Sequence, residues 1–433
     1  MVIEPATTKI GVDRRQFARM LAGGTSAWIL GAGAEALASV PLLAPTPAAP
    51  DERFWTSVRE QFLLPPDLAV INAANLCPAS APVVQALVDA TRDVDRDPSP
   101  ANRVKMSEGK ETTRRLLAEF LRVTPEEIVI TRNTSEANNL VSSGLDLKAG
   151  DEVVIFGDNH PSLHAAWRDK AQRFGYTVRA VEQVNPHPGA EYYLDAFARQ
   201  MTPRTKVVAF SHLTNTVGDL LPAKELCRLA RERGAMSVVD GAQTLGLLDV
   251  NLSDMQPDFY SGSAHKWPCG AREAGVLFAS ARVHDRIWPS IISLYAGAVG
   301  ISKKLEGLGQ RDEAAIIAFG EALRFQTKVG RGAIEARGRE LAQALMAGLG
   351  RLDGVKVWTH AAPARSAAVV SFRPGNLDAS KLAAALYERD RIVGMPRGGQ
   401  DRGGLRLSPH FYNLHTEVER TIEAVRRYLR AGI

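Results

Sequence analysis

Cysteine is scarce in this sequence, and neither sign of charge dominates it. Three cysteines in 433 residues are too few and too scattered for a disulfide framework. Lysine and arginine total 53 against 48 aspartates and glutamates, a net charge of +5, and the basic residues form no run that would indicate a nucleic-acid partner. Apolar residues are plentiful at 45%, which is enough for a large core in a chain of two or three domains.

Residues 1–38 differ in kind from the rest. A DRRQF run precedes a Gly- and Ala-rich apolar stretch over residues 20–37, and residues 36–38 have the small-x-small form of a cleavage site. This resembles a twin-arginine export signal, so we expect the twin-arginine translocase to carry the folded protein to the periplasm, or otherwise out of the cytoplasm. A membrane anchor is the alternative, although Glu35 and the many small residues suit a permanent span poorly. A Pro- and Ala-rich linker follows over residues 39–53.

From residue 54 onward, short apolar runs alternate with amphipathic segments. One such segment is bounded by Pro222 near its start and Gly234 at its end, as helices often are. The alternation indicates an α/β layered fold with a largely parallel sheet. The candidate strands are residues 128–131, 153–156, 178–181, 207–211, 237–240 and 275–279.

After about residue 314 the pattern changes to long helices with shorter apolar runs between them. Thr416 and Glu419 have the spacing of a capping box at the start of the last of these helices. We therefore expect a large domain over residues 54–313 and a smaller C-terminal α/β domain over residues 314–433, against which the N-terminal arm can also pack.

Lys266 and Asp240 are the most informative pair of residues. Asp240 ends an apolar run in VVDGAQ, and Lys266 follows a second strand in SGSAHKW. A pyridoxal phosphate (PLP) site needs a lysine to bond to the aldehyde and a carboxylate to hold the ring nitrogen protonated. A lone lysine is more often solvated, and Asp240 alone could be a helix cap or pair with a nearby arginine. A buried carboxylate is, however, costly without a cationic partner, which a pyridinium supplies. Gln243 could then donate to the phenolic oxygen of the ring.

Two short segments could hold the phosphate group of that cofactor. Thr134 and Ser135 follow a candidate strand and open a helix, where hydroxyls and free backbone N–H groups suit an anion. Ser263 and His265 lie beside Lys266 and add further donors. By itself the first segment is an ordinary helix cap, so the prediction depends on the two segments converging.

Three polar residues in loops are weaker candidates. His160 is placed where an imidazole could stack on the pyridine ring, although a histidine on such a loop is more often structural. Asn215 is either a turn residue or a contact to cofactor and substrate, and Asn75 is more often a turn former than a substrate contact. The sequence indicates no metal ligands.

Six motifs carry a family resemblance: TRNTSEANN, NHPSLHAAW, SHLTNTVG, VVDGAQ, SGSAHK and RLSPHFYN. In their order and spacing, the chain from about residue 67 to its C-terminus resembles the class V aminotransferase-fold PLP enzymes, which include cysteine desulfurases and isopenicillin N epimerase. The resemblance implies PLP fold type I, with a mostly parallel seven-stranded sheet in the large domain. It also implies a homodimer with sites at the interface.

The same resemblance implies a role for each candidate residue. Arg406 is implied as the fork that grips the substrate carboxylate, with Asn215 near the substrate. The implied cofactor contacts are Lys266 at the aldehyde, Asp240 at the ring nitrogen, Gln243 at the phenolic oxygen, His160 on the ring face, and Thr134, Ser135, Ser263 and His265 at the phosphate.

Departures from the family pattern bear on the reaction. Cysteine desulfurases carry a nucleophilic cysteine on a C-terminal loop, and this chain has no cysteine after Cys269, which argues against persulfide chemistry. A Gly-rich loop (PRGGQDRGG) lies there instead and offers Arg397, Gln400 and Arg402 as substrate contacts, unless it is a flexible surface turn. Residues 271–273 (ARE) replace a Pro-Thr-Gly run whose threonine reaches the partner subunit's phosphate in many relatives.

These observations predict an exported PLP-dependent enzyme that acts at the amino-bearing carbon of an amino acid or of an amino-acid- or peptide-derived metabolite. Lys266, once released from the cofactor, is the expected general base. Transamination is preferred, with epimerisation and carbon–sulfur lysis as alternatives, and a non-catalytic exported binding protein as an alternative of another class. The HKW run, the charged pair after it and the export signal are also similar to the exported PLP enzyme that tailors pyoverdine siderophores, in secondary metabolism.

Overall fold

The computed structural model describes residues 41, 43–398 and 401–433. The predicted export signal over residues 1–38 and the candidate contact Gln400 lie outside these residues. Residues 43–433 form one compact unit. None of the described helices combines the length and the apolar character that crossing a membrane requires.

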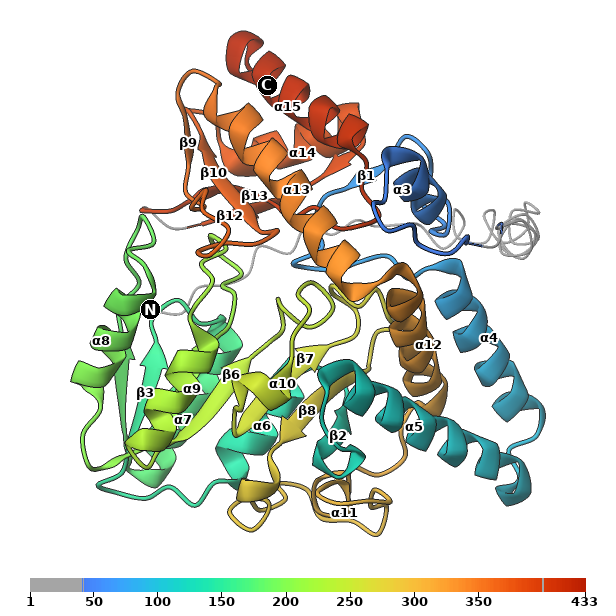
Figure 1. Cartoon of the computed structure of the whole chain (residues 1–433), viewed down its shortest axis with the longest axis vertical. Coiled ribbons are helices and arrows are strands. Elements are labelled where there is room, and N and C mark those ends of the chain that lie inside the picture. The colour runs from blue at the N-terminus through green and yellow to red at the C-terminus, as the bar shows by residue number, and fades with distance from the viewer. Residues whose placement is uncertain (1–40, 42, 399–400) are drawn as a thin grey trace, which may run out of the picture. The chain divides into compact units, whose positions relative to one another are not determined.

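A seven-stranded sheet is the central element of this unit (Figure 1). Strands β4, β3, β5, β6 and β7 are parallel to one another, whereas β8 is antiparallel to both of its neighbours, β7 and β2. The predicted α/β fold with a mostly parallel seven-stranded sheet is confirmed. In spatial order the strands are β2 (Ile128–Thr131), β8 (Gly275–Ala279), β7 (Phe259–Ser263), β6 (Met236–Asp240), β5 (Thr205–Ser211), β3 (Glu152–Phe156) and β4 (Thr177–Val181).

Helices cover both faces of the sheet, which explains why its strands are apolar runs instead of alternating ones. In β3, Val153 and Ile155 pack into the same apolar cluster as Leu163 and Trp167. Their neighbours along the strand point the other way, into the cluster that contains Phe197. The helices of the two layers include α6 (Thr134–Gly144), α7 (Pro161–Phe174), α8 (Ala190–Gln200) and α9 (Ala223–Glu232).

A second, antiparallel sheet lies in the C-terminal part of the chain, in the spatial order β12, β13, β10, β9. Helix α12 packs against α4 and α5, whereas the helix after it, α13, packs against α15. The predicted division into domains at residues 313 and 314 stays a prediction. The elements concerned are β9 (Val355–Val357), β10 (Val370–Pro374), β12 (Met395–Arg397), β13 (Gly404–Leu407), α4 (Ala81–Arg96), α5 (Pro100–Leu121), α12 (Glu313–Val329), α13 (Arg331–Gly350), α14 (Ala379–Asp390) and α15 (His415–Ala431).

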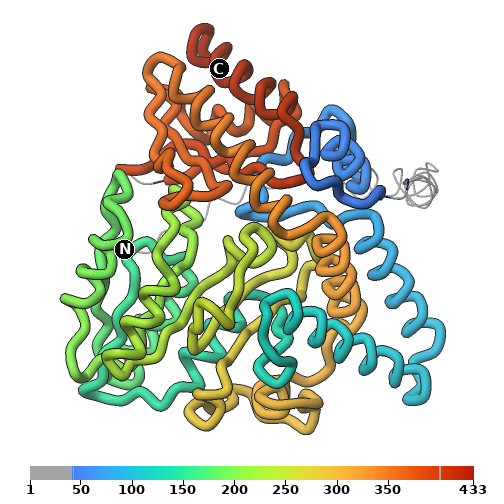
Figure 2. Tube along the Cα trace, viewed as in Figure 1, coloured from blue at the N-terminus to red at the C-terminus, as the bar shows by residue number. Residues whose placement is uncertain are grey.

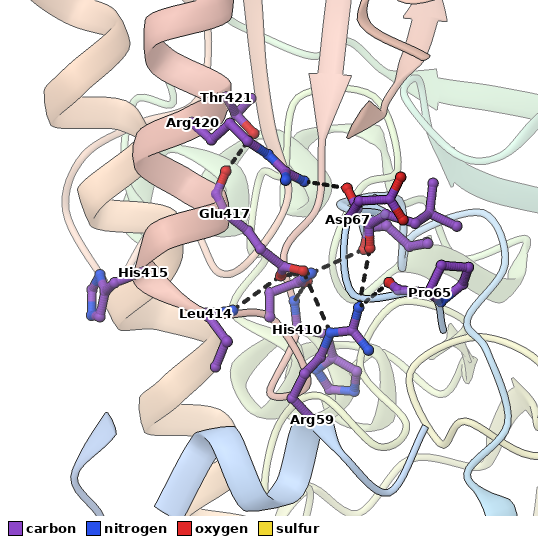
Figure 3. A network of polar contacts seen from close by, with 12 residues as sticks. Arg59, Pro65, Asp67, His410, Leu414, His415, Glu417, Arg420 and Thr421 are labelled. Carbon is purple, nitrogen blue, oxygen red and sulfur yellow. Dashed lines mark hydrogen bonds and ion pairs between the residues drawn. The ribbon is translucent and has the colours of Figure 1, made fainter. Parts of the chain in front are cut away.

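The N-terminal arm, residues 43–70, lies beside the C-terminal elements, as Figure 2 shows for the blue and red ends of the described chain. Strand β1 (Ala69–Val70) pairs in parallel with β11 (Ile392–Val393). From α3 (Glu52–Arg59), the guanidinium of Arg59 donates to the backbone oxygens of Pro65 and Leu68 and lies 3.4 Å from a carboxylate oxygen of Glu417 (Figure 3).

The predicted capping box at Thr416 and Glu419 is wrong. Helix α15 begins one residue earlier, at His415, and the carboxylate of Glu417 accepts from the backbone N–H of Leu414 at 3.1 Å. Glu417 also contacts Arg59 of the arm. A tertiary contact therefore helps to determine which acidic residue caps this helix, in addition to the local spacing.

Candidate active site

A cavity of about 320 Å³ opens where the parallel strands β3, β5, β6 and β7 end. The carboxyl ends of parallel strands meet at one edge of a sheet, and loops that leave this edge converge on the same space. Every residue to which the sequence assigned a cofactor or substrate role in the described chain lines this cavity, with the exception of Arg402. The lining residues are Ala74, Asn75, Asn133, Thr134, Ser135, His160, Ser162, Ser211, Leu213, Asn215, Asp240, Ala242, Gln243, Ser263, His265, Lys266, Arg397 and Arg406.

Asp240 is a buried carboxylate at the end of β6. One oxygen accepts from the backbone N–H of Ala242 at 3.0 Å, and the other accepts from the side-chain amide of Asn138 at 3.1 Å. The amide oxygen of Asn138 in turn accepts from the hydroxyl of Ser261 at 2.8 Å. Asp240 has no ion-pair partner within the described residues. An aligned, desolvated carboxylate of this kind fits a cationic ring nitrogen.

Lys266 lies on a tight turn after β7. The backbone N–H of Cys269 donates to the carbonyl of Lys266 at 2.9 Å, and Cys269 has a φ of 57°, in the left-handed region that non-glycine residues rarely adopt. The amine of Lys266 makes no hydrogen bond or ion pair with any described residue. Burial lowers its pKa, Asp240 opposes that shift, and Arg406 adds to it. The neutral, nucleophilic form of the amine is therefore easier to reach than in a solvent-exposed lysine.

The loop after Asp240 is held against this turn. Gly246 has a φ of +82°, and a Cβ atom there would lie 2.6 Å from the backbone nitrogen of Pro268, so only glycine permits the approach. The indole N–H of Trp267 donates to the side-chain oxygen of Gln243 at 2.7 Å, and the amide nitrogen of Gln243 donates to the carbonyl of Ala74 at 3.0 Å. These bonds fix the orientation of the Gln243 amide toward the cavity.

His410 packs against the same turn and is hydrogen-bonded to it. Its Nε2 lies 2.7 Å from the carbonyl oxygen of Trp267, which also accepts from the side chain of Gln326 at 2.6 Å. Because a carbonyl only accepts, Nε2 carries the hydrogen. Burial lowers the pKa of His410 to about 3, so the ring is neutral at physiological pH.

The start of α6 and the end of β7 form a cluster of hydroxyls and N–H groups. The hydroxyl of Ser263 accepts from the backbone N–H of Thr134 at 2.9 Å and lies 2.7 Å from the hydroxyl of Thr134. Ser135 lies 3.5 Å from the hydroxyl of Ser162, and burial lowers the pKa of the nearby His265 to about 4. A cluster of neutral donors at a helix N-terminus fits a phosphate group.

His160 is the N-cap residue of α7, and its ring is oriented by Ser162. The backbone N–H of Ser162 donates to Nδ1 at 3.2 Å, and the Ser162 hydroxyl lies 2.7 Å from the same atom. Burial lowers the pKa of His160, and Lys266 lowers it further. A neutral ring that accepts at Nδ1 carries its hydrogen on Nε2.

Arg406, on β13, is 2% exposed and lines the cavity. It donates to the carbonyl oxygen of Asn215 at 2.8 Å and to the side-chain oxygen of Asn72 at 3.3 Å. Asn215, which also lines the cavity, therefore contacts Arg406 through its backbone. Asn75, which also lines the cavity, is exposed and donates its backbone N–H to Asn72 at 3.0 Å.

One other predicted contact, Arg402, is placed differently. Arg402 pairs with the buried carboxylate of Asp158 at 3.2 Å and does not line the cavity, so its prediction as a substrate contact is not supported by this geometry. Arg272 and Glu273 are exposed beside the lysine turn, and Glu273 has a φ of 62°. No group of three or more His, Cys, Asp or Glu side chains that could hold a metal ion occurs in the part of the chain that the structure describes.

The residues present fit PLP at each of its polar groups. Lys266 can bond to the aldehyde, Asp240 can neutralise the ring nitrogen, Gln243 can donate to the phenolic oxygen, and the α6 cluster can hold the phosphate. Sequence reasoning missed the residues that orient these groups, namely Asn138, Ser261, Ser162, Asn72 and His410. Asn138 has one sequence signal, because it lies four residues after Thr134 and so on the same helix face.

Comparison with known proteins agrees with this assignment. Residues 77–420 match the aminotransferase class-V family. Isopenicillin N epimerase of Amycolatopsis lactamdurans is 33% identical over 390 residues, which cover 86% of this chain and 98% of that protein. A probable cysteine desulfurase of Methanothermobacter thermautotrophicus is 27% identical and covers 84% and 95%.

Solved structures share the fold. A C-DES variant with glycine covalently linked to its PLP cofactor superposes with a TM-score of 0.79 at 22% identity, covering 87% of this chain and 99% of that one. The apo cysteine desulfurase of Thermococcus onnurineus NA1 gives a TM-score of 0.76 at 26% identity, covering 86% and 97%. With the family match and the site geometry together, this chain belongs to the class V aminotransferase family, and its cofactor is pyridoxal phosphate.

Proposed function

We propose that the protein is an exported PLP-dependent aminotransferase that acts on an amino acid or an amino-acid-derived metabolite. The observation that carries the proposal is the convergence of Lys266, Asp240 and Arg406 on one cavity. Bound PLP withdraws electrons from the amino-bearing carbon of the substrate. Arg406 binds the substrate carboxylate through its guanidinium and so orients that carbon in the cavity.

Lys266 is the base that takes the proton from the amino-bearing carbon. Its lowered pKa favours the neutral amine that this step requires. Asp240, which is held by Asn138 and Ala242, places a carboxylate where it can stabilise a protonated ring nitrogen of the cofactor. Transamination needs only one base, because the amine of Lys266 that removes the proton can also deliver it again on the same face of the substrate. Among the other titratable groups of the cavity, His160 is held by Ser162 at the start of α7.

Epimerisation is the second candidate, because the relative with 33% identity is named isopenicillin N epimerase. This reaction needs a proton donor on the face opposite Lys266. Carbon–sulfur lysis has the support of relatives named as probable cysteine desulfurases, but the three cysteines, Cys77, Cys227 and Cys269, are all buried and none lines the cavity.

Product analysis distinguishes these reactions. The purified holoenzyme is incubated with amino donors and pyruvate, and the mixture is analysed for a new keto acid, for the inverted stereoisomer and for a released sulfur product. We expect a keto acid. An inverted stereoisomer without keto acid would replace the proposal by epimerisation, and an enzyme that retains PLP but changes none of the donors would favour a binding protein.

Export and assembly are part of the proposal. The export signal supports a periplasmic location, which fractionation of cells carrying Arg14→Lys and Arg15→Lys together would test, since both substitutions should retain the protein in the cytoplasm. An exposed apolar segment supports a homodimer, with Ile292 87% and Leu294 100% exposed. Light scattering of the purified protein should give twice the mass of one chain.

A further inference from the structure

Two arginines face the cavity from the same side of the C-terminal sheet. In the antiparallel pair β12 and β13, Met395 lies opposite Arg406 and Arg397 lies opposite Gly404. Residues opposite each other, and residues two apart on one strand, share a face, so Arg397 and Arg406 are diagonal neighbours. Both line the cavity.

Neither arginine forms an ion pair with a described residue, although Asp158 attracts Arg397 from a greater distance. The hydrogen bonds of Arg406 go to uncharged oxygens, and its Nε atom is buried without a partner among the described residues. Arg397 is half-buried and makes no hydrogen bond or ion pair within residues 43–398 and 401–433. Arg402, in the same loop, differs because it pairs with Asp158. Burial, followed by the nearby Arg397, lowers the pKa of Arg406 to about 9, as expected for two cations that share one cavity.

The acidic groups of the cavity do not balance these charges. Asp240 is the one carboxylate among the lining residues, and it serves the ring nitrogen at the end of β6. The cofactor phosphate is assigned to the cluster of Thr134 and Ser263. One substrate carboxylate compensates Arg406. The guanidinium of Arg397 then faces the cavity with its donors unpaired among the described residues, and the carboxylate that attracts it, Asp158, is ion-paired with Arg402 instead.

We propose that Arg397 binds a second anionic group, a carboxylate at the far end of the substrate side chain, so that the enzyme selects dicarboxylic amino acids. The inference rests on the proposed function in taking Arg406 as the partner of the first carboxylate. A guanidinium binds a carboxylate through two parallel hydrogen bonds, which gives both charge compensation and orientation. Arg397 then determines which substrate side chains the enzyme accepts. Lys266 and Asp240 serve the reaction itself, whether it is transamination, epimerisation or lysis.

Equilibrium binding of unreactive acids to the holoenzyme tests the assignment without turnover. Calorimetry is run with glutarate, a dicarboxylate, with butyrate, a monocarboxylate, and with 4-phosphonobutyrate, which carries a phosphonate at the far end. The wild type should bind glutarate at least 10-fold more tightly than butyrate. Arg397→Gln should weaken glutarate binding by about 10- to 100-fold, the range for a charge-assisted contact, with butyrate changed less than about 3-fold. Arg397→Lys should fall between the two.

Arg389→Gln is the matched control, because this arginine lies on the exposed side of α14 and its removal changes the net charge equally. It should leave all three affinities unchanged. If Arg397→Gln weakened the binding of glutarate and of butyrate equally, Arg397 would share the carboxylate that Arg406 binds. If 4-phosphonobutyrate bound more tightly than glutarate, the second anionic group would be a phosphate. Either result overturns the proposal. Glutarate selectivity that depends on Arg397, without keto acid from glutamate, would retain this inference while refuting the proposed aminotransferase reaction.

Discussion

His410 should make the folded protein sensitive to mild acid. The ring is 0% exposed, and burial lowers its pKa to about 3 in the folded chain, against the ordinary value of 6.5. A base whose folded pKa is depressed binds more protons when unfolded, so stability is lost as the pH falls below about 6.5 and continues to fall toward pH 3. At about 1.4 kcal/mol for each pH unit, this single residue should cost about 2 kcal/mol of unfolding free energy between pH 7.5 and pH 5.

Urea unfolding at these two pH values measures the effect. His410→Gln retains a side chain that can donate to the carbonyl of Trp267 but cannot be protonated, so its loss of stability between pH 7.5 and pH 5 should be smaller than that of the wild type by about 2 kcal/mol. His415→Gln is the control, because His415 is partly exposed and contacts Glu340 at the surface. If His410→Gln shows the same pH-dependent loss as the wild type, the buried ring is not the source and the reasoning fails.

The remaining predictions concern the site. Asp240→Asn should fold and bind PLP but turn over about 10²–10³-fold more slowly, because the charge opposite the ring nitrogen is lost, and Asn138→Ala should show a smaller decrease in kcat with a shifted cofactor absorbance. Addition of PLP to the apoenzyme should accelerate with rising pH and level off below pH 10.5, the ordinary pKa of a lysine amine, because burial lowers the pKa of Lys266; a rate that still rises at pH 10.5 would contradict the shift. Borohydride reduction followed by mass spectrometry should find the cofactor on Lys266 and nowhere else. Trp267→Phe should cost about 1–3 kcal/mol of unfolding free energy, because the amide oxygen of Gln243 loses its donor.

The cavity could be predicted from the sequence because its residues follow strands. Asp240 and Asn215 each come shortly after an apolar run, Lys266 follows the short strand β7, and a parallel sheet brings the ends of its strands to one edge whatever the details of packing. Pairing partners could not be predicted in this way. Arg397 and Arg402 look alike in a Gly-rich loop, and only the folded chain shows that the carboxylate of Asp158 forms an ion pair with Arg402 and not with Arg397.

Rules based on local sequence spacing failed where a side chain also contacts a segment that is distant in the chain. The spacing of Thr416 and Glu419 satisfies the capping pattern, yet Glu417 caps the helix because the same carboxylate also meets Arg59, 358 residues earlier in the chain. Asn138 was missed for a similar reason, since its amide bridges Asp240 and Ser261 on two different strands. Contacts of this kind depend on tertiary register, which no short motif encodes.

The pairing of Ala69 with Ile392 sets the order of events during synthesis. The two residues are 323 positions apart, so at about 5–20 residues per second the ribosome needs roughly 15–65 s to make the second after the first. Throughout that interval β1 lacks the strand with which it pairs, although Ala74, just after it, can already accept a hydrogen bond from Gln243. The cavity also takes Arg397 and Arg406 from beyond Ile392, so its full lining exists only after the last strands of the chain have been made.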